Sequence, residues 1–387
     1  MRRSGVRVLA ACIFAVWLQA PAQSEEIPDA AKDQPVERAK IDLSVPEAPA
    51  FTALGLTPQE VIHPTSPRAL AGQLLNGVDP RGNLQTGLAV DTSPYLLAYG
   101  NSLTLSEYNA SPAARLLART QVSLATAKGT DDDDEAVRVG LGFRLTPWDR
   151  GDPRQDGDLL ACFGKNLRSP EAIRLGDEIQ RLAEEGADQE TIDEKRAELK
   201  VLTDMPATRC REASRARNWN ASSWTLGLAP SWISASGKVG DLESNGASFW
   251  SSFAYGFEEV PGLRDASQLL IGARYNNDEN VPDPDATDEG TFLNQNSLTV
   301  GMQLRLAAYR PNEDRAPSVI LSLEGDYVHA ERDLRPDDDQ YRGSLGADFK
   351  IPGTDDLYFK VSVGGSGGGD GEEDDQGFVL GTLRFGS

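Results

Sequence analysis

Residues 376–387 read QGFVLGTLRFGS, and apolar and polar side chains alternate along this stretch. In an extended strand, successive side chains point to opposite faces. One face then carries Val379, Gly381, Leu383 and Phe385, and the other carries Leu380, Thr382 and Arg384. The stretch therefore predicts a β-strand with one apolar and one more polar face.

Ten further segments upstream repeat this period of two, so the sequence predicts an all-β protein. The segments are 88–96, 115–127, 137–145, 224–232, 249–257, 269–275, 298–306, 319–327, 341–351 and 357–363. Such a series is typical of a transmembrane antiparallel β-barrel, in which lipid-facing and lumen-facing side chains alternate. The alternative is a soluble β-protein, which would need a second sheet to cover its apolar faces.

The eleven segments leave the strand count uneven. Single-chain bacterial barrels have an even number of strands. We therefore expect about twelve strands, with ten as the fallback. The missing strand is expected in 78–86, 101–108 or 157–164.

Composition excludes two classes of protein. The 387 residues carry a formal net charge of −22, and the mean hydropathy is −0.42. After the N-terminal segment, no apolar run is long enough for a membrane-spanning helix. A strongly acidic chain is also poorly suited to nucleic acid, which is bound by clustered Lys and Arg.

The N-terminus predicts export. Residues 1–22 resemble a secretory signal peptide, with Arg2, Arg3 and Arg7 before an apolar core, Val8–Leu18, and small residues at Ala20 and Ala22. A lipid-modified Cys12 is the alternative reading of this segment. Residues 23–80 are predicted to be a flexible periplasmic linker with a short helix at 66–76, capped by Ser66. That helix either rests on the periplasmic rim of the barrel or plugs its lumen.

Residues 149–220 interrupt the β pattern of the predicted barrel domain, 81–387. Ser169-Pro170 begins a helix that ends near Gly186, and Asp188 caps a second helix. The two cysteines that remain after export, Cys162 and Cys210, flank this αα-hairpin. An oxidising compartment favours a disulfide between them.

Loop lengths predict the orientation. The short turn 352–356 falls on the same side as the C-terminus, whereas the acidic stretches 276–296, 332–340 and 365–376 fall on the other. Long outer loops and short periplasmic turns are typical of outer-membrane barrels. Both termini and the helical insertion are therefore expected in the periplasm. A strand hidden within 149–220 would instead place the insertion outside.

Over residues 80–387, apart from the insertion, the chain resembles outer-membrane β-barrel proteins of Gram-negative bacteria. Residues 48–78, APAFTALGLTPQEVIHPTSPRALAGQLLNGV, are similar to the leader of an uncharacterised group of predicted outer-membrane proteins. The resemblance implies a fold and a location in the bacterial outer membrane, in contact with lipid and lipopolysaccharide. It implies no reaction.

The predicted lumen is rich in arginine. The charged residues on the more polar faces are Arg119, Arg138, Arg144, Arg274, Arg305, Arg342, Lys350, Lys360, Arg384, Asp91, Glu324, Asp326 and Asp348. Rings of charge tune which ions pass a pore. These groups either pair across the lumen and fill it, or they line a narrow pore that favours small anionic solutes.

Three functions follow as hypotheses. The first is a porin-like channel or small-solute transporter, and the second is a non-transporting structural barrel whose helical insertion docks a periplasmic partner. The third is an outer-membrane hydrolase using His329, but no serine motif accompanies this histidine, and we expect no enzyme. Asp283, Asp285, Asp288 and Glu289 offer oxygen ligands for Ca²⁺, but their spacing matches no EF-hand loop. We assign no metal and no cofactor.

Overall fold

The structure is a computed structural model, and every residue that it describes lies in the second of two units, 1–40 and 41–387. It describes residues 44–56, 61–64, 66–99, 104–128, 136–167, 169–257, 267–282, 292–311, 316–332, 338–352, 354, 357–368 and 376–385. The predicted signal peptide, 1–22, and the first part of the predicted linker lie outside the described residues.

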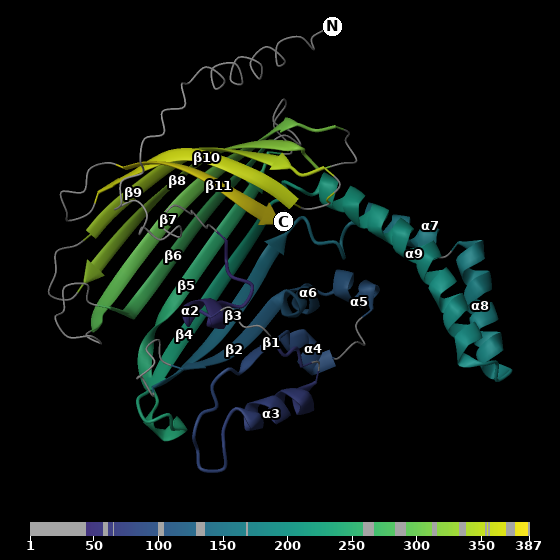
Figure 1. Ribbon diagram of the computed structural model, residues 1–387, viewed down its shortest axis with the longest axis horizontal. Helices are drawn as coiled ribbons and strands as arrows, with labels where there is room; N and C mark the ends of the chain where they lie inside the picture. The colour runs from purple at the N-terminus through teal and green to yellow at the C-terminus, as the bar shows by residue number, and fades with distance from the viewer. Residues whose placement is uncertain are drawn as a thin grey trace, which may run out of the picture. The chain divides into compact units, whose positions relative to one another are not determined.

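The described elements are mostly strands, with helices before the sheet, between its first and second strands, and between its third and fourth strands (Figure 1). The helices are α2 (Pro49–Ala53), α3 (Pro67–Asn76), α4 (Pro94–Tyr99), α5 (Leu105–Ala110), α6 (Pro112–Ala118), α7 (Gly157–Leu167), α8 (Pro170–Glu184) and α9 (Gln189–Arg217), with a 3₁₀ turn η3 (Val239–Asp241). The strands are β1 (Ala89–Thr92), β2 (Thr120–Lys128), β3 (Val137–Asp149), β4 (Ser223–Ser234), β5 (Glu243–Gly256), β6 (Ser267–Pro282), β7 (Phe292–Tyr309), β8 (Val319–Arg332), β9 (Asp338–Lys350), β10 (Leu357–Gly368) and β11 (Gln376–Phe385).

The strands form one antiparallel sheet in chain order, from β1 to β11. Each of the eleven predicted segments corresponds to one strand, so the prediction of an antiparallel β-protein is confirmed. The expected twelfth strand is not among the described residues: α5 covers 105–110, α7 covers 157–167, and residues 78–86 form turns and isolated bridges. Over the part of the chain that the structure describes, β1 and β11 form the two edges of the sheet and do not pair with each other.

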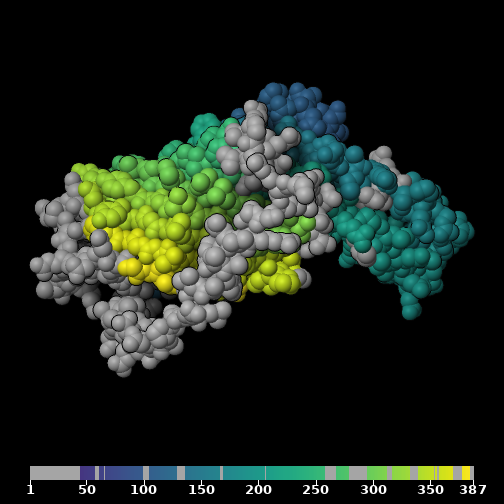
Figure 2. Space-filling view, turned by 90° about the horizontal axis from the view of Figure 1, so that it is seen from above, coloured from purple at the N-terminus to yellow at the C-terminus, as the bar shows by residue number. Residues whose placement is uncertain are grey.

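The alternation of side chains gives the sheet two chemically different faces. Paired residues such as Arg144 and Gly227, or Glu324 and Ser344, lie on the same face, which we call the polar face. The opposite, apolar face carries Leu323 opposite Leu345. Burial is reversed relative to that of a soluble sheet: Leu323 and Leu345 are 55% and 60% exposed, whereas Glu324 is 6% exposed. Figure 2 shows β8–β11, green to yellow, with no described helix lying over them.

Two predicted strand ends are wrong. The alternation in 88–96 predicts a strand through Leu96, but β1 ends at Thr92 and α4 begins at Pro94. Likewise, residues 112–118 form α6 rather than the start of β2, and Ser111 caps this helix by accepting a hydrogen bond from the Ala114 N–H. Pro fits the first turn of a helix because its missing N–H has no partner there. The Ser-Pro pairs therefore favour helices over strands.

Residues 44–56 are packed rather than extended as a flexible linker. Helix α2 contacts β2, β3 and β4, and Figure 1 shows it on the concave side of the sheet. A Cβ at Gly142 would lie 2.3 Å from the Ala50 nitrogen, and one at Gly227 would lie 2.7 Å from Cγ1 of Val45. Glycines on the polar faces of β3 and β4 therefore make room for this segment.

The predicted helix at 66–76 is confirmed as α3, whose N-cap Ser66 accepts a hydrogen bond from Ala69. It has no buried residues, so α2, not α3, fills the polar face. Beyond α3, the Leu84 N–H donates to Gly237 O at 2.7 Å. Gly237 lies between β4 and β5, at the end of the sheet opposite the helical insertion. Residues 82–84 are therefore not on the same side as that insertion.

The insertion between β3 and β4, as far as the structure describes it, consists of three helices, α7, α8 and α9, and the segments that join them. Ser169 and Asp188 cap α8 and α9, as the sequence predicts. A disulfide joins Cys162 of α7 to Cys210 of α9, with 5.8 Å between their Cα atoms. Among the described residues, no helix is both long and apolar enough to cross a membrane.

The sheet has two distinct ends. The insertion and α4–α6 lie where β3 ends and β4 begins, and β11 ends there too, because Phe385 pairs with Leu357 at the start of β10. We call this the helix-bearing end and the opposite one the loop-bearing end. The acidic stretches within 129–135, 283–291, 333–337 and 369–375 connect strands at the loop-bearing end and lie outside the described residues.

Candidate functional site: the polar face and an arginine pocket

Nearly all the charged residues predicted to share one face do so. The strand register places Asp91, Arg138, Arg144, Arg274, Arg305, Glu324, Asp326, Arg342, Asp348, Lys350, Lys360 and Arg384 on the polar face. The side chain of Arg384 lies outside the described set. Arg119 is the exception, because it caps the end of α6 before β2 begins.

Strands β8–β10 hold ion pairs on the polar face. Lys360 Nζ donates to Oε1 of Glu324, and the guanidinium of Arg342 binds Asp326, with Nε 2.9 Å from Oδ1. The side chains of Glu324 and Asp326 are 5% and 1% exposed. Buried charges need such partners because desolvation disfavours the ionised form. Arg342 and Asp326 thus pair between neighbouring strands, whereas Lys360 of β10 reaches Glu324 of β8 across the intervening β9.

Arginines on β3, β6 and β7 have neutral groups among their partners. Arg144 Nη1 donates to Gln121 Oε1 at 3.1 Å, and Arg305 Nη1 donates to Gln268 Oε1 at 3.3 Å. The guanidinium of Arg274 lies 5.5 Å from the ring centre of Trp250, in a cation–π arrangement. Among the charged residues that the register places on the polar face, Arg and Lys outnumber Asp and Glu.

Helix α2 and the residues before it cover the rest of the polar face. Ala50, Phe51 and Leu54 form a buried cluster with alanines of β1 and β2. Val45 packs against Ala229 and Trp250 in a second cluster. The Ala50 N–H donates to Ser123 Oγ at 3.1 Å. The N-terminal segment therefore occupies space that a pore through this face would need.

A second site lies at the helix-bearing end, where Arg119 is fixed by several partners. Its Nη2 donates to Asp152 Oδ2 at 2.6 Å and to Gln155 Oε1 at 3.1 Å, and its Nε donates to the Tyr108 hydroxyl at 3.2 Å. The Tyr108 hydroxyl donates to the same Asp152 carboxylate. Burial opposes ionisation of Asp152, but these hydrogen bonds outweigh it, so the pKa of Asp152 lies below its ordinary value of 3.8.

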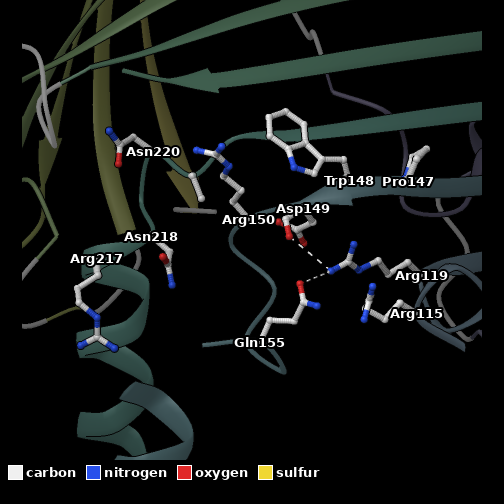
Figure 3. Close-up of a pocket in the computed structure, with 11 residues that line it drawn as sticks. Arg115, Arg119, Pro147, Trp148, Asp149, Arg150, Gln155, Arg217, Asn218 and Asn220 are labelled. Atoms are coloured by element: carbon white, nitrogen blue, oxygen red, sulfur yellow. Dashed lines mark hydrogen bonds between the residues drawn. The ribbon is translucent and has the colours of Figure 1, made fainter. Parts of the chain in front are cut away.

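Arg119 lines a pocket of about 740 Å³ (Figure 3). Four arginines line it against one aspartate; the full lining is Arg115, Arg119, Pro147, Trp148, Asp149, Arg150, Gln155, Arg217, Asn218, Asn220 and Ala221. The single acidic group, Asp149, accepts a hydrogen bond from the Gly151 N–H at 2.8 Å. The lining therefore offers mainly hydrogen-bond donors with positive charge, which suits an anionic ligand.

Sequence reasoning missed this pocket because its residues are far apart along the chain. Arg115 and Arg119 come from α6, Arg150 follows β3, and Arg217 ends α9. Arg119 is present in the sequence as a predicted lumen residue, but the pocket forms only when the insertion returns to the sheet. The run of arginines at 209, 211, 215 and 217 is the one local signal that could have suggested it.

The predicted hydrolase residue His329 contacts Asp339, with 2.8 Å between Nδ1 and Oδ1. Tyr327 donates to the same Asp339 oxygen at 2.5 Å. His329 pairs with Leu298 on the apolar face, so it does not join the charged groups of the polar face. The predicted Ca²⁺ ligands, Asp283, Asp285, Asp288 and Glu289, lie outside the described residues.

Geometry is thus the sole guide to function for this chain. Comparisons with protein-family models, curated proteins and solved structures give no match.

Proposed function

We propose that the chain is an outer-membrane β-barrel whose polar face lines a narrow passage for small anionic solutes. The observation that supports it is the reversed burial of the sheet. Large apolar side chains such as Leu345 and Val379 are 60% and 68% exposed, whereas the carboxylate-bearing Asp348 is 2% exposed. In water this arrangement is unfavourable, but in a bilayer it places apolar groups against lipid and polar groups inside.

Aromatic residues on the apolar face support the same proposal. Trp224, Tyr255 and Tyr309 are exposed near the helix-bearing end, and Tyr327 pairs with exposed Tyr341 toward the loop-bearing end. Barrels in lipid carry aromatic girdles at both interfaces. Tyr341 and Phe349 of β9 are eight positions apart, which corresponds to about 27 Å of strand. That length is comparable to the apolar band of such barrels.

Anion preference rests on the charge of the polar face. Ion pairs neutralise Glu324 and Asp326, while Arg144 and Arg274 have neutral side chains among their partners. A narrow path beside these arginines would attract anions. The planar-bilayer conductance of the full chain tests this proposal: steady steps with anion selectivity are expected, and cation selectivity would contradict it.

A second candidate is a structural barrel that carries no solute. The packing of 45–54 against the polar face favours it, because Ala50, Phe51 and Val45 are buried there. Insertion into the bilayer without measurable current would favour this candidate over the channel.

Membrane insertion itself can be tested with Leu323→Arg, on the apolar face, against Ile173→Arg, on α8. These side chains are 55% and 51% exposed, so in a soluble protein each change would alter stability by about 0.5 kcal/mol or less. In a bilayer, Leu323→Arg is expected to cost about 2–4 kcal/mol in unfolding from lipid vesicles. Equal, small effects of both changes would contradict membrane insertion.

A further inference from the structure

The pocket at the helix-bearing end is built to hold an anion. Arg119 uses Nε and Nη2 for its contacts with Asp152, Tyr108 and Gln155, so its guanidinium is oriented before any ligand arrives. Preorganised donors bind more tightly because no ordering entropy is lost on binding. Figure 3 shows Arg115 and Arg119 on one side of the pocket and Arg217 on the other, with Arg150 between them.

Arg217, on the far side of the pocket, is held by longer contacts than Arg119 is. Arg217 Nη2 lies 3.3 Å from both oxygens of Asp156, and its Nε lies 3.8 Å from Asp158. These distances are long for charge-assisted hydrogen bonds, which are typically about 2.8 Å. Arg150 stands over the Trp148 ring, 5.5 Å from its centre, and its residue is exposed. The Arg217 guanidinium can therefore turn toward a ligand at small cost.

Trp148 connects the pocket to the apolar face. It lines the pocket, and its ring stacks on Phe253 at 6.0 Å, which stacks on Tyr255 at 6.5 Å. Tyr255 in turn meets Phe257 edge-on at 5.3 Å. Trp and Tyr concentrate at the depth of lipid headgroups. If the apolar face meets lipid, the pocket therefore opens at the level where phosphate groups lie.

From these contacts we infer that this pocket binds a phosphate group, and that its source is the headgroup of an anionic phospholipid. A phosphodiester offers oxygens in several directions, which suits guanidinium groups converging from α6, α9 and the end of β3. A carboxylate offers only two oxygens, both in one plane, and so presents acceptors in fewer directions. The amides of Gln155, Asn218 and Asn220 add neutral hydrogen-bonding groups around it. The lipid source rests on the proposed membrane insertion; phosphate binding does not.

The test compares two double variants with the same loss of charge. Arg150→Gln/Arg217→Gln removes two pocket arginines, and Arg209→Gln/Arg211→Gln removes two exposed arginines of α9 that do not line the pocket. Arg119 is kept because it packs against Asp152. The full-length protein in detergent is titrated with phosphatidylglycerol and with phosphatidylcholine, and bound lipid is counted by native mass spectrometry. A parallel titration uses inorganic phosphate.

We expect the pocket variant to bind phosphatidylglycerol at least about tenfold more weakly than the wild type, as the loss of charged hydrogen bonds implies. The control variant should bind phosphatidylglycerol as tightly as the wild type does. The binding of phosphatidylcholine should be the same in both variants and the wild type. Equal binding of phosphatidylglycerol by all three proteins would overturn the inference.

The source of the phosphate is decided separately. If inorganic phosphate binds as tightly as the lipid and depends on the same arginines, the headgroup assignment is overturned and a soluble phosphate is the ligand. If the chain fails to enter vesicles but still binds phosphate through Arg150 and Arg217, the proposed membrane function fails while the pocket stands.

Discussion

The backbone N–H of Ala50 donates a 3.1 Å hydrogen bond to the hydroxyl of Ser123, across 73 positions of the chain. Ser123 is 1% exposed and Ala50 fully buried, so this bond fixes α2 against the polar face of β2. Gly142 of β3 lies directly beside this hydrogen bond. Because Gly142 has no side chain, α2, β2 and β3 can pack closely there.

Gly142→Ala should therefore release the N-terminal segment. The added methyl group would lie 2.3 Å from both the Ala50 nitrogen and Ser123 Oγ, and overpacking of this kind costs about 1–3 kcal/mol. We expect the Ala50 amide to lose its protection against hydrogen exchange. The control is Gly325→Ala, where the nearest atom is 3.7 Å away. Unchanged protection in Gly142→Ala would show that the segment is held by other contacts.

Substitutions of Glu324 and Lys360 should have coupled effects on the free energy of unfolding. Lys360→Met leaves the carboxylate of Glu324 buried without its cation, which costs about 3–5 kcal/mol in a dry interior. Glu324→Gln/Lys360→Met should recover most of this loss, as measured by urea unfolding in lipid vesicles. If the single change costs less than about 1 kcal/mol, water reaches Glu324 and the polar face is hydrated at this level.

Asp152→Asn should destabilise the fold in a pH-dependent way. Since the pKa of Asp152 lies below 3.8 in the folded chain, its ionised form stabilises the fold above pH 3.8, and this stabilisation is lost as the pH falls further. We expect a loss of about 3 kcal/mol near pH 7, which shrinks below pH 3.8. Asp158→Asn, at an 82% exposed side chain, is the matched control. A loss that stays constant from pH 7 to pH 3 would count against an ionised Asp152.

Removing the disulfide should loosen the insertion more than the sheet. Cys162 and Cys210 are 48 positions apart, and closing a loop of that size is worth about 4 kcal/mol at most in the chain-entropy model. In Cys162→Ser/Cys210→Ser, protease sites in α7–α9 should be cut faster while the strands keep their protection. Equal cutting rates with and without the disulfide would show that packing alone holds these helices.

Much of the sheet could be predicted from the sequence, because side chains alternate between the two faces of a strand whatever packs against it. Leu298, Val300 and Met302 need only alternate with Thr299 and Gly301 for both faces to be assigned, and the register confirms that assignment. The helices were harder to predict. The Ser-Pro pairs at 66 and 169 indicate helix starts correctly. The same signal at 93 stands within a segment whose apolar residues also alternate, and the one at 111 stands just before another such segment.

The arginine pocket and the packing of α2 were beyond sequence reasoning for a different reason. Arg115, Arg150 and Arg217 have no shared local pattern, and they meet only through the path of the insertion. Similarly, nothing near Gly142 or Gly227 in the sequence indicates that residues 45–54 fill the space above them. Sites assembled from distant segments depend on tertiary geometry, which periodicity does not encode.

The insertion between β3 and β4 also bears on the order in which the sheet assembles. All neighbouring strands from β4 to β11 are joined by shorter connections, so pairing each of these strands with the one before it closes a shorter loop. Pairing of β3 with β4 has to close residues 150–222 first, at an entropic cost that rises with the length of the free loop. Once α7 and α9 are joined through Cys162 and Cys210, much of that length is no longer free. The cross-linked hairpin therefore lowers the entropic cost of bringing β3 beside β4.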